Sequence, residues 1–146
     1  MNITLWILQV LLAVAFFAHG WLLLMPPPEI AAQMNAELPR WFWVFLGVAE
    51  VLAAVGLTVP GLTRILPWLV PAAATGVIVV MVAATVWHVV RGEWASAGIT
   101  AVLLAMAAFI AYARWRIAPI RARGAIRRHI QGLRRFPEPE DRASQP

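Results

Sequence analysis

The chain has 146 residues, 62% of them hydrophobic, and a mean hydropathy of +0.75; soluble domains carry about 45–50% apolar residues, so lipid must cover what a small core could not bury. No cysteine is present, which excludes disulfide exchange, thiol catalysis and iron–sulfur ligation by this chain alone. The formal net charge is +5, and eight of the 12 arginines lie between Arg114 and Arg135. Such a basic block beside a membrane helix indicates anionic lipid, rather than nucleic acid, as its partner.

Four apolar stretches are separated by proline, glycine or arginine, and each is long enough to span a membrane. About 20 helical residues, rising 1.5 Å each, cross a hydrocarbon core of about 30 Å. The sequence therefore predicts an all-α, polytopic membrane protein, in which residues 1–115 form a bundle of four transmembrane helices and a C-terminal amphipathic helix follows. The predicted spans are about 3–25, 40–59, 71–90 and 94–113.

The first stretch ends at Pro26-Pro27-Pro28, which cannot continue a helix. A cleaved signal peptide is the alternative interpretation, because Ala13-Val14-Ala15 resembles a small-residue cleavage site. However, the N-terminus has no basic side chain, and the apolar run continues ten residues beyond that site. A membrane-spanning helix is therefore the favoured interpretation.

Residues 28–39 separate the first two spans and place two apolar side chains four residues apart. This spacing predicts a short amphipathic helix that lies over one end of the bundle. The second span is placed before Pro60-Gly61, since proline interrupts a helix. The third is placed to begin at Pro71, because proline is favoured in the first helical turn.

Residues 116–136 are predicted to form a basic amphipathic helix on the cytoplasmic leaflet, since Ile126, Ile130 and Leu133 share one helical face. A solvated helix and a partner-binding tail remain alternatives. Residues 137–146 are acidic and proline-rich, which predicts disorder. The arginines expected to contact anionic lipid are Arg121, Arg123, Arg127, Arg128, Arg134 and Arg135.

Arginine placement predicts the orientation. With four spans, Arg64 and the arginine-rich tail share one side of the membrane. The opposite side holds Arg40 and Arg91, whose charges are offset by nearby glutamates. The positive-inside rule then places both termini in the cytoplasm, in the plasma or inner membrane of the cell.

Three ionisable residues fall within the predicted spans, where a central charge costs about 2.5–3.5 kcal/mol on insertion scales. From the helix boundaries, His19 lies about 9 Å and Glu50 about 15 Å below the outer edge, and His88 lies within about one turn of it. All three fall in the outer half of the bundle. One pocket could therefore collect them.

Small neighbours support this prediction, because they let another helix approach. Gly47 shares a helical face with Glu50, and Thr85 shares one with His88. A structural role remains the alternative: a neutral, hydrogen-bonded Glu50 and a hydrated interfacial His88. A bis-histidine haem at His19 and His88 has no further supporting signal. A metal site would need at least three ligands, which His19, Glu50 and His88 could supply, but it is not the favoured interpretation. The predicted ligand-binding residues are His19, Gly47, Glu50, Thr85 and His88.

The chain resembles the DoxX-like family of small four-helix membrane proteins over roughly residues 5–115. The residues that carry the resemblance are, in order, Phe16-Phe17-Ala18-His19-Gly20, Ala32-Gln33-Met34, Leu38-Pro39, Gly47-Val48-Ala49-Glu50, Gly56-Leu57, Pro60-Gly61, His88 and Arg91-Gly92-Glu93. The family takes its name from a membrane subunit of a thiosulfate:quinone oxidoreductase, so the resemblance implies a link to quinones. Other relatives are linked to oxidative-stress complexes or to receptor chaperoning. Many relatives have lysine where this chain has Leu23.

The leading hypothesis is a membrane subunit of an oxidoreductase system that holds a quinone-linked or lipid-like ligand. Glu50 would supply a proton-linked carboxyl, His19 and His88 would donate hydrogen bonds, and residues 28–39 would cover the mouth of the pocket. The alternative is a non-catalytic membrane scaffold, assembly factor or chaperone, which acts through a membrane protein partner or a second copy. Whether the chain is an enzyme is left open.

Overall fold

A computed structural model describes residues 2–120 of the chain. The predicted lipid-contacting arginines from Arg121 to Arg135, and the predicted disordered segment 137–146, lie outside these residues. The described part contains the helices α1 (Asn2–Leu24), α2 (Pro28–Glu37), α3 (Arg40–Thr63), α4 (Leu69–Val90) and α5 (Trp94–Tyr112), and the π-helical turn η1 (Ala113–Ile117).

The predicted all-α architecture with four membrane-spanning helices is confirmed. Helices α1, α3, α4 and α5 are each long and apolar enough to cross a bilayer. The short α2 forms the helix predicted between the first two spans. The chain is therefore a multi-pass membrane protein.

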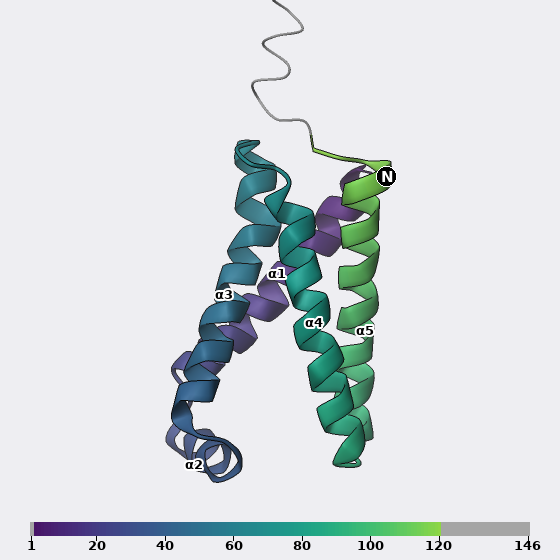
Figure 1. The fold of residues 1–146 in the computed structure, drawn as a ribbon. Helices are drawn as coiled ribbons and strands as arrows, with labels where there is room; N and C mark the ends of the chain where they lie inside the picture. Colours follow the sequence, from purple (N-terminus) through teal and green to yellow (C-terminus); the bar gives the residue numbers. More distant parts are fainter. Residues whose placement is uncertain (1, 121–146) are drawn as a thin grey trace, which may run out of the picture.

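The four spans form two pairs (Figure 1). Helix α1 packs mainly against α3, α4 packs mainly against α5, and the contact between α3 and α4 joins the pairs. The start of α1 and the end of α5 lie at one end of the bundle, called here the tail end, and α2 lies at the other, the α2 end. The core that joins both pairs includes Leu12, Phe16, Leu57, Val77 and Ile110.

Two helix boundaries differ from the prediction. Helix α3 continues through Pro60 to Thr63, although the second span was expected to end at about 59. Proline removes one backbone hydrogen bond, and membrane helices tolerate this loss where neighbouring groups compensate. Helix α4 begins at Leu69 rather than at Pro71. Proline is tolerated throughout the first turn, because the first N–H groups of a helix have no intrahelical acceptor.

Glycine brings α1 and α3 into direct backbone contact. A Cβ atom added at Gly20 would lie 2.9 Å from the carbonyl oxygen of Gly47, and one added at Gly47 would lie 2.9 Å from the carbonyl oxygen of Gly20. Real Cβ atoms essentially never approach another heavy atom so closely. The two helices therefore cross at a distance that only glycine permits on both sides.

A buried polar cluster ties three helices together at the tail end. Gln9 of α1 is fully buried and donates from Nε2 to the carbonyl oxygen of Leu57 in α3 at 2.8 Å. Arg114, which is 3% exposed, donates from Nε to Oε1 of Gln9 at 2.5 Å, and its guanidinium lies 5.4 Å from the ring centre of Trp6. The sequence places Arg114 in the basic block expected to meet anionic lipid, whereas Arg114 is buried in the bundle, in the π-helical turn after α5.

At the α2 end, Arg40 holds the turn between α1 and α3. Its guanidinium donates to the carbonyl oxygens of Leu23 and Leu24 at 2.8 and 2.6 Å. These carbonyls end α1 and have no intrahelical partner, so a cation there is favourable. The indole N–H of Trp43 donates to the carbonyl oxygen of Met34 at 2.9 Å and so attaches α2 to α3.

We expect Gly47→Ala to lower the free energy of unfolding by about 1–3 kcal/mol, because its methyl group must displace the α1 backbone. The variant can be measured by unfolding in mixed micelles, followed by tryptophan fluorescence. Gly98→Ala is the matched control, since a Cβ at Gly98 meets nothing within 4 Å. Equal stability of the two variants would show that α1 and α3 can move apart to accept a methyl group at little cost in free energy.

Candidate functional site

Glu50 is a carboxyl residue buried inside the membrane-spanning part of α3, and it is 2% exposed. Its Oε2 lies 2.7 Å from Nδ1 of His19 on α1, and the two atoms share a hydrogen bond. The side chain of His19 is 57% exposed. The pair therefore connects a fully buried oxygen to a side chain at the surface of the bundle.

The glycine contact between α1 and α3 positions this pair. Gly20 follows His19 directly, and Gly47 precedes Glu50 by one helical turn. A Cβ at Gly20 would also lie 3.0 Å from Cβ of Glu50. Because the two backbones meet here, the imidazole of His19 lies close enough to hydrogen-bond with the carboxyl of Glu50.

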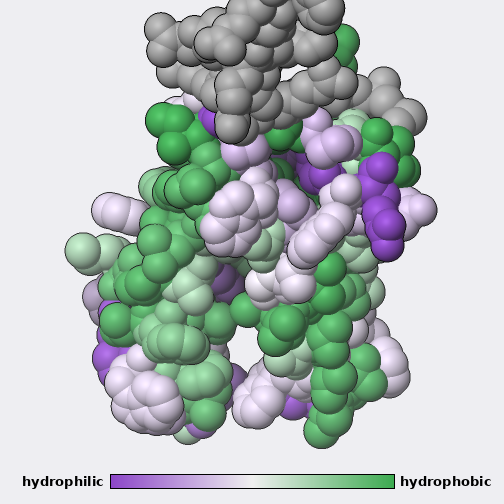
Figure 2. Space-filling model, turned by 45° about the horizontal axis from the view of Figure 1, so that its top comes forward, coloured by the Kyte–Doolittle hydropathy of each residue, from purple (hydrophilic) through white to green (hydrophobic). Residues whose placement is uncertain are grey.

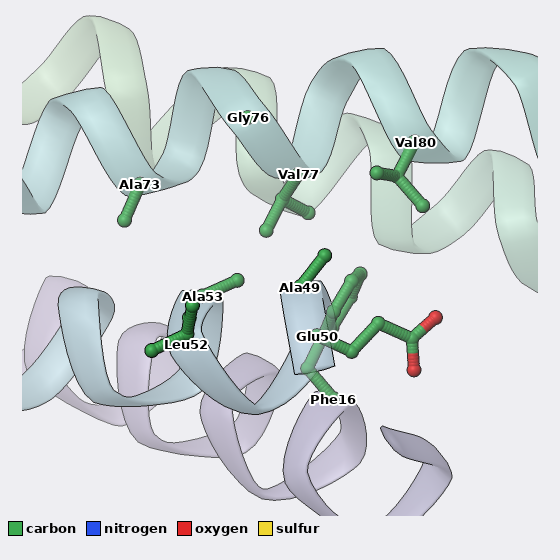
Figure 3. Close-up of a pocket in the computed structure, with 9 residues that line it drawn as sticks. All are labelled: Phe16, Ala49, Glu50, Leu52, Ala53, Ala73, Gly76, Val77 and Val80. Atoms are coloured by element: carbon green, nitrogen blue, oxygen red, sulfur yellow. The ribbon is translucent and has the colours of Figure 1, made fainter. Parts of the chain in front are cut away.

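Glu50 also lines a groove of about 360 Å³ between α3 and α4 (Figure 3). The other lining residues are apolar or glycine, so Glu50 supplies the polar atoms of the lining. Phe16 of α1 lies at the floor, on the side away from α4. The lining residues are Phe16, Ala49, Glu50, Leu52, Ala53, Ala73, Gly76, Val77 and Val80.

The groove exists because the spacing between α3 and α4 changes along their length. Toward the tail end the helices are close, since a Cβ at Gly56 would lie 2.8 Å from Cβ of Ala73. One turn further along α4, a Cβ at Gly76 would meet nothing within 4 Å. Leu52 at the groove is 64% exposed. The groove is therefore closed toward the tail end and open sideways, on the apolar surface of the bundle.

One oxygen of Glu50 is left for a ligand. Oε2 is engaged by His19, and Oε1 makes no hydrogen bond with any side chain in the described range 2–120. In Figure 3 the carboxyl group points along the gap, away from Ala73 and toward the end where Val80 lies. Oε1 therefore offers a hydrogen-bonding atom in a lining that is otherwise apolar, to which a polar group of a ligand in the groove can bond.

The other predicted site residues have different roles. Nδ1 of His88 lies 2.6 Å from Oε2 of Glu93, not beside Glu50. The hydroxyl of Thr85 donates to the carbonyl oxygen of Met81 at 2.7 Å and is 2.9 Å from the hydroxyl of Thr100 on α5. Gly47 contacts α1 and does not line the groove. The structure therefore brings together His19 and Glu50, with Gly47 behind them.

No three His, Asp or Glu side chains in the described part of the chain are grouped closely enough to hold a metal ion. The arrangement of His19, Glu50 and His88 around one metal, weighed as an alternative above, is not formed there. The groove also contains no cationic side chain. This lining disfavours an anionic ligand, which would face the Glu50 carboxyl in a low-dielectric site.

A charged cluster at the α2 end links the two helix pairs. Nη2 of Arg91, which follows α4, lies 2.7 Å from Oε1 of Glu37 at the end of α2, and Nε of Arg91 lies 2.7 Å from Oε1 of Glu93. Gly92 makes the turn that returns Glu93 to Arg91 and His88, and its φ of +71° favours glycine. Figure 2 shows an open notch between the pairs at this end.

At the level of sequence, Arg91 and the nearby glutamates set the orientation, and Arg91-Gly92-Glu93 carried part of the family resemblance, so the cluster was not predicted. The Arg-Gly-Glu spacing could have indicated the local pair, whereas the contact to Glu37 needed the fold. The pKa of Glu93 lies below its ordinary value, chiefly because Arg91 donates a hydrogen bond to it and also because His88 does.

Comparison with known proteins supports the family assignment. A family model described as the DoxX-like family matches residues 7–110, which is more than half of the chain. No curated protein and no solved structure matches the chain.

We expect the α2-end cluster to weaken in acid. A lowered folded-state pKa means that Glu93 stabilises the fold above the pKa of the unfolded chain, and that this contribution is lost as the pH falls through the folded value. Glu93→Gln should therefore flatten the dependence of the thermal unfolding midpoint on pH below about 4.5.

Glu29→Gln provides the control for that measurement, because Glu29 forms no ion pair within residues 2–120. If Glu93→Gln and Glu29→Gln had the same pH profile as the unsubstituted protein, the cluster would make no contribution to acid stability.

Proposed function

The chain belongs to the DoxX-like family, and we propose that it binds a quinone-linked or lipid-like ligand in the groove between α3 and α4, as a membrane subunit of an oxidoreductase system. The observation that carries this proposal is the buried Glu50 carboxyl in an otherwise apolar groove. Such a group is costly in a membrane and marks a functional site by default.

The shape and lining of the groove support a ligand from the bilayer. Its volume of about 360 Å³ lies at the lower end of the range of small-molecule sites, which is about 300–1,000 Å³. Apolar walls with a single polar group are typical of sites that orient an apolar molecule by one hydrogen bond. A ligand that is soluble in the membrane would meet the groove from the side.

In this proposal Glu50 is the hydrogen-bonding and proton-linked group. In the protonated form of Glu50, Oε1 donates to a carbonyl oxygen of the ligand, and in the ionised form it accepts from a hydroxyl. His19 holds the other oxygen at 2.7 Å and fixes the direction of the carboxyl. Because His19 shares this hydrogen bond, its imidazole can exchange a proton with Glu50.

The roles proposed for His88 and for residues 28–39 change with the geometry. His88 interacts with Glu93 and is not assigned to the ligand. Helix α2 contributes no side chain to the groove, whose lining comes from α1, α3 and α4. The site is therefore proposed as His19, Glu50 and the groove walls.

We expect purified protein to carry a bound quinone or single-chain lipid, detected by mass spectrometry of its organic extract and by its absorption spectrum. Glu50→Gln should reduce that content about tenfold, the effect of about 1.4 kcal/mol in binding. Glu37→Gln is the control, since it removes a carboxyl outside the groove. Unchanged ligand content in Glu50→Gln would contradict the proposal and favour the scaffold role.

The proposed orientation has both termini in the cytoplasm, because Arg64 and the arginine-rich tail share one side. The chain has no cysteine, so single cysteines can be introduced without background. A membrane-impermeant maleimide should label Gln33→Cys in intact cells and Ile65→Cys only after permeabilisation. Both positions are exposed, and the opposite pattern would invert the topology.

A further inference from the structure

We propose that the α3–α4 groove is a lateral port, which holds a neutral head group against Glu50 while the single apolar chain of the ligand leaves sideways into the bilayer. This inference rests on the proposed function and specifies the class of ligand. The site would select the head group and tolerate chains of different length.

The direction of the chain follows from where the groove is closed. Phe16 forms the floor, and the close approach of Gly56 to Ala73 shuts the end that faces the tail. The Glu50 carboxyl points toward the opposite end, near Val80. The chain of a head group at Glu50 therefore cannot leave at the tail end, and we place its exit on the open side, beside Leu52 and Gly76.

The open side lies where side chains are small or exposed. Leu52 is 64% exposed, and Gly76 has no side chain to fill the space opposite α3. Both residues belong to membrane-spanning helices, so the opening faces lipid. A chain that passes between them would exchange one apolar environment for another, at little cost in free energy.

The volume limits what the groove can enclose. About 360 Å³ is near the lower limit of the volumes of small-molecule sites. A ring or other small head with the first part of a chain fits this space, whereas a long isoprenoid or acyl chain does not. The rest of the chain must lie outside the groove, so the groove cannot discriminate between ligands by chain length.

The charge of the lining specifies the head. Glu50 is the ionisable residue of the groove, and no cation accompanies it there. A phosphate or an ionised carboxylate would be repelled, while a carbonyl or a hydroxyl can bond to Oε1. A neutral amphiphile with one chain therefore fits, and this chemistry is shared by isoprenoid quinones and long-chain alcohols.

Gly76 allows a direct test, because a larger side chain there would occupy the port. A Cβ at this position meets nothing within 4 Å, so Gly76→Ala adds a methyl group without a close contact, and Gly76→Leu extends the side chain further into the open space. Gly98 of α5 has the same open surroundings but does not line the groove. Gly98→Leu therefore repeats the same substitution in a membrane helix without blocking the port.

The experiment uses the full chain in phosphatidylcholine nanodiscs and two photoreactive probes with the same saturated chain. One probe ends in a benzoquinone ring and the other in a primary alcohol, and each carries a diazirine within its chain. Saturable labelling should map to α3 and α4 beside the groove. Gly76→Leu should reduce it about tenfold, Gly76→Ala should reduce it less, and Gly98→Leu should leave it unchanged.

The outcomes separate this inference from the proposed function. If Glu50→Gln loses labelling while Gly76→Leu retains it, the head site stands and the lateral port is overturned. If neither substitution affects labelling, or if neither probe labels the unsubstituted protein saturably, both proposals fall. Labelling by only one probe supports the port and identifies the head as a quinone or a hydroxyl. If Gly76→Leu does not fold, Gly76→Ala provides the test. Labelling of Gly76→Ala equal to that of the unsubstituted protein would contradict the port.

Discussion

The backbone contact between Gly20 and Gly47 is the constraint on which the candidate site depends. Two membrane helices approach this closely only where both lack a side chain. The contact sets α1 against α3 and brings the His19 ring to 2.7 Å from the buried Glu50 carboxyl. A larger residue at either glycine would separate the helices and leave Glu50 without its partner. Packing and site chemistry therefore have one cause.

The second feature follows from how α3 meets α4. The helices are close at Gly56 and diverge past Gly76, so a groove opens beside the carboxyl that α1 has positioned. Glu50 thus lies between a histidine on one side and an apolar space on the other.

Two polar clusters lie near the ends of the spans, and neither contributes a residue to the groove. At the tail end, Gln9 joins Arg114 to the backbone of α3. At the α2 end, Arg91 connects Glu37 to Glu93. Both clusters tie helices from different parts of the sequence, and both lie near the ends of the spans. The groove lies between them, where the two helix pairs are held together mainly by apolar contacts.

Sequence alone determined the four spans, the short helix between the first two, the intramembrane position of His19 and Glu50, and the family. Hydrophobic length and arginine or proline breaks are local properties, and a membrane makes them decisive. Tertiary structure decided which ionisable groups meet. Helical spacing gives the face of a residue but not the rotation and crossing of its neighbours, so His88 was grouped with Glu50 although it interacts with Glu93. The burial of Arg114 depended in the same way on a π-helical turn that changes the direction of its side chain.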